Sequence, residues 1–511
     1  MIELNNEKLT KLYSALKAFD HSNRLYFGDD TISNRYYLFI ALHEDLVSHG
    51  IGALVNYFFD NFDSPGVDLN LRSILETLAL IEYLNSKQIT DFQYDLFRKH
   101  YWLVEEANRV RLMPYIKDLE EFDDDQRLKA ELIHSIAQYL SLRDEDVEAL
   151  YAKNDPLFVF TIDEKTMTYS RLIEKMLGVD FYHYYQFLSV NIHPHLFGDK
   201  IAKAQELRNV IIEGILRILD QYIASLGFYD IELDISKPND EITGSTRLIV
   251  FERINSKNRI MQEILVEMSH LPAEHAMTIY EKELLGNLTS VIKDMDLCEL
   301  LGYNEQTTIK YKVFVESAAV LMKFSNLKRD KESEMIQQAF CDSSLVQAQL
   351  IIDKINRNKT KIDEEMINNY YKFYQEKYKV DFETFRKQFL SNAFYAISKS
   401  QKNYKFLVRD TSDLIENNEI QRKIDNYLYL VSLDLGHAGG YLFNSSESVW
   451  TYSARHCLEY TSKYIHKLFK VKLLSVVERN PESNIGQLFL NLLIVMKKDL
   501  EKFNVLKTNI H

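Results

Sequence analysis

Two charged residues, Arg72 and Glu76, interrupt an otherwise apolar run in the first part of the chain. The run extends from Leu71 to Leu84, and its leucines and isoleucines would cover nearly the whole circumference of a helix. A helix of this kind belongs in the centre of a bundle, where charges must pair or serve a site. Because the arginine guanidinium matches the geometry of phosphate oxygens, Arg72 with Glu76 indicates a phosphate-binding site.

A histidine and two further polar residues follow at spacings that could complete such a site. Ser189 and His193 are one helical turn apart in an aromatic-rich stretch, and Arg208 lies on the next predicted helix. Histidine exchanges protons near neutral pH. We therefore expect His193 and Glu76 to be catalytic, His193 as acid or base and Glu76 to orient a partner. The residues expected to bind the ligand are Arg72, Ser189 and Arg208.

The second half of the chain contains a similar set of residues in the same order and at similar separations. A cation again precedes a glutamate by four residues inside an apolar run, and a serine, a histidine and an arginine follow. These residues, which we also expect to bind ligand, are Lys312, Glu316, Ser432, His437 and Arg455. A repeat of this length indicates a duplicated domain. Because Lys312 stands where the first set has Arg72, one copy could be structural only.

The same residues also fit a structural network, and both interpretations stay open at the level of sequence. In the second interpretation Arg72 and Glu76 pair with each other, and His193 bonds a main-chain carbonyl at a helix end. The sequence His193-Pro194-His195 would also suit a metal ion, but neither a cysteine cluster nor an H-E-x-x-H motif accompanies it. We predict neither a metal nor a cofactor.

The elements that must position these residues are predicted to be long helices. Only 15 glycines and 7 prolines occur among 511 residues, so few turns are available. We predict a mostly α fold of two tandem related helical bundles, residues 1–226 and 260–511. Within residues 227–259, two stretches alternate apolar and polar residues, which is typical of paired strands. This segment is predicted to be a linker containing a short β-hairpin.

Charge and cysteine content restrict the function and the compartment. The formal net charge of −14 argues against a surface that coats nucleic acid without selectivity, although it allows a local basic site. The three cysteines are far apart, so no disulfide framework is expected and a reducing cytoplasm is the predicted location. No run reaches the roughly 18 apolar residues of a membrane span, so no membrane contact is predicted.

An R-x-x-x-E helix followed by a Y-x-x-L-S-x-x-x-H motif resembles an uncharacterised bacterial family related to the HEPN-like helical bundles. The matching residues are Arg72, Glu76, Tyr185, Leu188, Ser189 and His193. The resemblance covers residues 30–225 and, more weakly, 290–470. It implies a helical bundle, frequent dimerisation, and the metal-independent RNA cleavage common in toxins and antiphage systems. The superfamily's catalytic arginine and histidine, four to six residues apart on a late helix, have no counterpart at Arg208 or Arg455.

These observations lead to two expected functions from different classes. The first is a bacterial stress or antiphage-defence protein that binds RNA or a nucleotide and, if it is an enzyme, acts as a metal-independent ribonuclease. The second is a non-catalytic interaction scaffold whose duplicated bundles form a dimerisation surface. A homo-oligomer is expected in both cases.

Overall fold

The computed structural model describes most of the chain, and each regular element in the described part is a helix. The described residues are 6–24, 34–86, 99, 103, 119–152, 168–193, 202–230, 238, 240–271, 277–327, 330–355, 364–391, 404–415, 419–437, 447–479 and 484–507. The prediction of a mostly α fold is confirmed. No described helix combines the length and the apolar character needed to cross a membrane.

The first half of the chain forms one set of helices around α3. These are α1 (Asn6–Arg24), α2 (Asn34–Asp60), α3 (Pro65–Ser86), α5 (Leu119–Leu140), α6 (Asp144–Ala152), α7 (Tyr169–Met176), α8 (Val179–Asn191) and α9 (Ala202–Ser225). The predicted apolar helix is therefore real and begins at Pro65, where proline suits a first helical turn. Glu82 and Asn85 are its exposed residues, as expected for a helix enclosed by its neighbours.

The second half forms another set of helices around α12. It contains α10 (Ser245–Ser269), α11 (Ile279–Leu301), α12 (Asn304–Ser325), α13 (Lys331–Ile355), α14 (Glu364–Tyr378), α15 (Phe382–Ser391), α17 (Tyr404–Ile415), α18 (Glu419–Leu435), α19 (Glu447–Arg479) and α20 (Ile485–Lys507). Helix α12 is buried without interruption from 306 to 322. Its N-terminal neighbour α11 starts with a capping box formed by Thr278 and Glu281.

The predicted β-hairpin in residues 227–259 is wrong for the part of that segment which the structure describes. Residues 228–230 and 240–242 are single 3-10 turns, and the stretch 247–253 belongs to α10. Over the full length of α10 the buried residues Ile254, Met261 and Met268 recur every seven residues, which is a helical spacing. The alternating stretch was too short to separate this period from a strand period. Packing of the longer helix decided the outcome.

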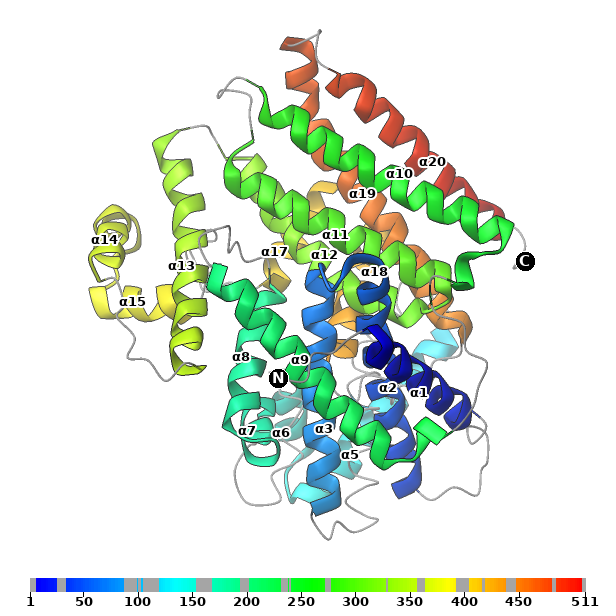
Figure 1. Ribbon diagram of the computed structural model, residues 1–511. Coiled ribbons are helices and arrows are strands. Elements are labelled where there is room, and N and C mark those ends of the chain that lie inside the picture. Colours follow the sequence, from blue (N-terminus) through cyan, green and yellow to red (C-terminus); the bar gives the residue numbers. More distant parts are fainter. Residues whose placement is uncertain are drawn as a thin grey trace.

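Helices α3 and α12 have matching neighbours. Helix α3 packs against α2, α7, α8 and α9, and α12 packs against α11, α17, α18 and α19. In addition, α1 covers α2 as α10 covers α11. Two hydrophobic cores result, one around α3 and one around α12. Helix α3 contacts both α11 and α12 where the cores meet. Figure 1 shows α3 and α12 within the molecule, with α10 and α20 along one side and α14 and α15 beyond α13.

Candidate functional site

The first polar cluster, here called the Arg72 half-site, forms around Glu76 on α3. Arg72 Nε donates to Glu76 Oε1 at 3.1 Å, and the Tyr185 hydroxyl on α8 donates to the same oxygen at 2.9 Å. His437, two residues beyond α18, places Nδ1 3.0 Å from Glu76 Oε2. The ring of Tyr169, the first residue of α7, stacks on the His437 ring at 5.7 Å. Three helices, together with the residues that follow α18, thus contribute to one cluster around a carboxylate that is fully buried.

The contacts of His437 define its protonation. Arg72 Nη2 lies 2.9 Å from Nδ1 and 3.2 Å from Nε2, but Arg72 can only donate, and Nδ1 also faces the Glu76 carboxylate. The arrangement that satisfies all three groups has Nδ1–H donating to Glu76 and Nε2 accepting from Arg72. Burial lowers the pKa of His437, and Arg72 lowers it further against the opposing effect of Glu76. His437 is therefore a neutral imidazole at neutral pH.

The second cluster, here called the Lys312 half-site, repeats this arrangement around Glu316 on α12. His193, two residues beyond α8, places Nδ1 2.8 Å from Glu316 Oε2, and the Tyr429 hydroxyl on α18 donates to Oε1 at 2.8 Å. The ring of Tyr404, the first residue of α17, stacks on the His193 ring at 4.6 Å. Lys312 Nζ lies 3.5 Å from Glu316 Oε2.

Electrostatics keep Glu316 ionised and His193 neutral. Burial by itself would raise the pKa of Glu316, but Lys312 and His193 outweigh burial and lower this pKa to about 2. Burial lowers the pKa of His193, and Lys312 adds to that effect. Burial also lowers the pKa of Lys312, and the charge of Arg72 contributes in the same direction. Because Arg72 acts on Lys312, the two half-sites form one electrostatically coupled centre.

The histidines are exchanged relative to the arrangement expected from sequence. We expected His193 to join Glu76 and His437 to join Glu316, each within its own half of the chain. Instead His193 bonds Glu316 and His437 bonds Glu76. Along α8, Tyr185 reaches one glutamate and His193, eight residues later, reaches the other, so this helix spans both half-sites. In the second half of the chain, Tyr429 on α18 bonds Glu316, and His437, just beyond the end of α18, bonds Glu76.

Arg208 does not join either half-site. Its Nε donates to Asp68 at 2.9 and 3.1 Å, and its Nη2 donates to the carbonyls of Phe62 and Ser64 at 2.9 and 3.2 Å. These bonds tie α9 to the turn between α2 and α3. The structure therefore places Arg208 at the start of α3 and not beside Arg72.

The remaining predicted residues differ in their surroundings. Ser432 donates to the Tyr429 carbonyl at 2.7 Å, which is a local helix contact. The buried Ser189 Oγ has no hydrogen-bond partner among the described residues. Arg455 is half-buried on α19, and its Nε likewise lacks a partner in the described part of the chain. Ser73 on α3 donates to the Gly436 carbonyl at 2.8 Å and so positions the residue before His437.

Sequence reasoning missed the two stacking tyrosines and the pairing of Tyr429 with Glu316. One signal was available for Tyr429: a tyrosine precedes the histidine by eight residues in both sets, as Tyr185 precedes His193 and Tyr429 precedes His437. Two helical turns separate such residues, so they share a face. The separations from Tyr169 and Tyr404 to these motifs differ, and no local spacing identifies them.

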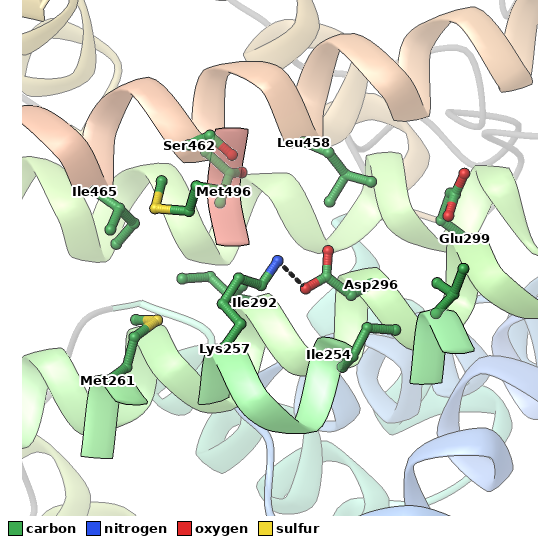
Figure 2. A pocket seen from close by; sticks show the side chains of 12 residues that line it. Ile254, Lys257, Met261, Ile292, Asp296, Glu299, Leu458, Ser462, Ile465 and Met496 are labelled. Atoms are coloured by element: carbon green, nitrogen blue, oxygen red, sulfur yellow. Dashed lines mark ion pairs between the residues drawn. The ribbon is translucent and has the colours of Figure 1, made fainter. Parts of the chain in front are cut away.

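A second candidate is a cavity of about 40 Å³ among α10, α11, α19 and α20, whose lining includes no residue of either half-site. Figure 2 shows Lys257 on α10 pointing at Asp296 on α11, with Leu458 and Ser462 of α19 opposite. Apolar side chains such as Met261 and Ile292 form the rest of the wall. An ion pair in so small a space neutralises itself and leaves room for a few waters. We therefore regard the cavity as a weaker candidate than the paired half-sites.

Among the described residues, no group of three or more histidine, cysteine, aspartate or glutamate side chains is arranged to hold a metal ion. Comparison of the chain with models of protein families, with characterised proteins and with solved structures finds no match.

Proposed function

We propose that the protein binds RNA or a nucleotide at the paired half-sites, as a cytoplasmic bacterial protein of the stress or antiphage-defence type. One observation carries the proposal. Each half-site presents a histidine whose side chain is about one-third exposed, at 32% for His193 and 33% for His437, beside a buried cation and a buried glutamate. A phosphate group needs the cation, and a proton transfer needs the histidine.

We further propose that the chain is a tandem duplication of one HEPN-like bundle. Supporting this, the matched helices α3 and α12 have matched neighbours, and the matched residues have nearly constant offsets in the sequence. Arg72 and Glu76 precede Lys312 and Glu316 by 240 residues, and Tyr185 and His193 precede Tyr429 and His437 by 244. The exchange of histidines then corresponds to a dimer of bundles within one chain, in which each bundle completes the other's cluster.

The chemistry available to these residues is proton transfer without a metal. A carboxylate that holds Nδ1–H fixes the imidazole tautomer. Nε2 of His193 is then left to face a reactant, whereas Nε2 of His437 accepts from Arg72 and faces a reactant only once Arg72 turns from it to a phosphate. A neutral histidine suits the removal of the proton from a ribose 2′-hydroxyl. The 2′-oxygen then bonds to the adjacent phosphorus, the bond from phosphorus to the 5′-oxygen breaks, and the histidine returns the proton to the leaving 5′-oxygen. Cleavage of RNA by this route is the catalytic form of the proposal, with His193 and His437 as the proton-transfer groups.

The second candidate is a non-catalytic helical scaffold that forms a homo-oligomer. It is favoured by the internal satisfaction of the Arg72 half-site, where Glu76 already accepts from Arg72, Tyr185 and His437. A network of this kind stabilises a core without any ligand. The two candidates differ in what His193 and His437 do once the fold is intact.

The test is binding and cleavage of RNA by the purified chain in the presence of a chelator. We expect a labelled single-stranded RNA to bind the chain. If two cations contact phosphates, a plot of log Kd against log salt concentration should have a slope of about 1.4 in magnitude. His193→Gln and His437→Gln should abolish cleavage while circular dichroism stays unchanged. Arg208→Met serves as the control, because it disturbs a structural contact and should leave binding intact.

Failure of the folded wild-type protein to bind RNA or nucleotides would refute the proposal. The scaffold candidate would then be measured directly, by the mass of the particle in solution. A cleavage activity that both histidine variants retain would show that another site, or a contaminant, cuts the RNA.

A further inference from the structure

Two buried polar atoms near the half-sites form no hydrogen bond with any described residue. One is Lys312 Nζ and the other is Ser189 Oγ. We propose that Lys312 and Ser189 together bind one oxyanion, the phosphate of the ligand, between the Arg72 and Lys312 half-sites. The identity of the ligand rests on the proposed function above, whereas the oxyanion site itself rests on the following contacts.

Lys312 has little left to bond in its own half-site. Its side chain is 3% exposed, and its nearest carboxylate oxygen, Glu316 Oε2, is 3.5 Å away and already accepts from His193 at 2.8 Å. The other oxygen of Glu316 accepts from Tyr429 at 2.8 Å. The ammonium therefore neutralises a carboxylate whose short bonds belong to other groups. Its nitrogen makes no hydrogen bond to any described residue.

A second lysine on the same helix shows that this situation is specific to Lys312. Lys310 is fully buried two residues earlier, and its Nζ donates to Asp294 Oδ1 at 2.6 Å and to Cys298 Sγ at 3.0 Å. A buried ammonium with good partners is stable without a ligand, and one without them calls for a further acceptor. The two buried lysines of α12 are therefore one of each kind.

The cation at the matching position is also engaged. Arg72 donates through Nε to Glu76 and through Nη2 to Nε2 of His437, so both of these nitrogens are engaged within its own half-site. The half-sites are therefore not equivalent: the Arg72 half-site is closed on itself, whereas the Lys312 half-site has a donor to offer. An incoming anion meets less competition at Lys312.

Ser189 is placed to be the second donor. It lies one turn after Tyr185 on the same face of α8 and four residues before His193, which follows the end of the helix. Tyr185 bonds Glu76 and His193 bonds Glu316, so Ser189 lies midway in the sequence between residues that reach the two glutamates. An anion held there would also be attracted by Arg72, whose charge already acts on Lys312. Two positive charges and a hydroxyl suit a phosphate oxygen.

The test uses inorganic phosphate as the probe with the full chain. Thermal unfolding is followed while phosphate is titrated, with sodium chloride holding the ionic strength constant, and the rise in Tm gives the affinity. Lys312→Met keeps the length and apolar stem of the side chain but removes the ammonium. It should weaken phosphate binding by about tenfold or more, the effect of losing one charge-assisted contact. Ser189→Ala should weaken binding by a smaller factor.

Lys310→Met is the matched control. It removes a buried ammonium from the same helix and should lower the Tm without changing the phosphate affinity. If Lys312→Met does not fold, the comparison of Ser189→Ala with wild type decides the question, because a serine-to-alanine change is small. The inference is overturned if the wild-type Tm does not respond to about 10 mM phosphate, or if Lys312→Met and Ser189→Ala both bind phosphate like wild type.

The outcomes separate this inference from the proposed function. Phosphate binding that depends on Lys312, in a protein that binds no RNA or nucleotide, would support the oxyanion site and refute the proposed function. RNA binding that survives in Lys312→Met would refute the oxyanion site and leave the proposed function standing. In that case a water molecule is the natural partner of Lys312.

Discussion

The exchanged pairing of histidines and glutamates can be tested by a double-mutant cycle on His193 and Glu316. His193→Phe keeps a ring against Tyr404 and removes the Nδ1 donor. Glu316→Gln keeps the shape of the side chain and removes its charge. The bond between them is 2.8 Å long and its acceptor is 1% exposed. Hydrogen bonds to charged groups contribute roughly 1.5–3 kcal/mol, so we expect a coupling energy of about 1–2 kcal/mol.

The assay is urea unfolding of the four proteins, with far-ultraviolet circular dichroism and tryptophan fluorescence required to give coincident transitions. A parallel cycle combines His193→Phe with Glu76→Gln. Because Glu76 takes His437 as its partner, this second coupling should stay below about 0.5 kcal/mol. A larger coupling of His193 to Glu76 than to Glu316 would refute the exchanged arrangement and restore the pairing within each half of the chain.

Two further predictions concern stability. Below pH 6.5 the protein should lose stability as the pH falls. Folding lowers the pKa of His437 from 6.5, so the unfolded chain binds this proton more readily than the folded protein does. Folding also lowers the pKa of Glu316 from 4.5 to about 2, so the stability that this carboxylate contributes is lost between those two pH values. Urea midpoints from pH 7 to about 2 measure this, and Glu316→Gln should flatten the part of the profile below pH 4.5. Gly52→Ala should cost about 1–3 kcal/mol because its methyl group would meet the Gln306 amide, whereas Gly286→Ala, with open space around it, should stabilise α11 by up to about 1 kcal/mol. Equal unfolding midpoints for the two alanine variants would contradict the packing at Gly52.

The central helices could be predicted from the sequence because their signal is local. An apolar stripe that covers every side of a segment requires enclosure by other helices, and α3 and α12 are enclosed. The pairing of Arg72 with Glu76 and of Lys312 with Glu316 is also local, since residues four apart are neighbours on any helix. The site residues on these helices were therefore recognisable without a structure.

The prediction of a hairpin was wrong because the local signal was ambiguous. A stretch of seven residues can match a strand period and a helical period equally well, and the choice depends on which side chains find a core. In α10 the buried positions include Ile254 and Met261, while Leu248 and Ile249 at the start of the helix are 45% and 57% exposed. Burial over the whole helix, and not the local pattern, selected the helical state.

The sequence by itself determined which helices are central and which charges they contain. The tertiary structure alone decided which histidine serves which glutamate, since His193 and Glu316 are 123 residues apart and His437 and Glu76 are 361 apart. It also decided that Arg208 holds the entry of α3 while Lys312 keeps a donor without an accepting group among the described residues. The physical reason is that hydrogen-bond partners across a bundle depend on how helix ends approach one another, and spacing along one helix contains no information about the position of another.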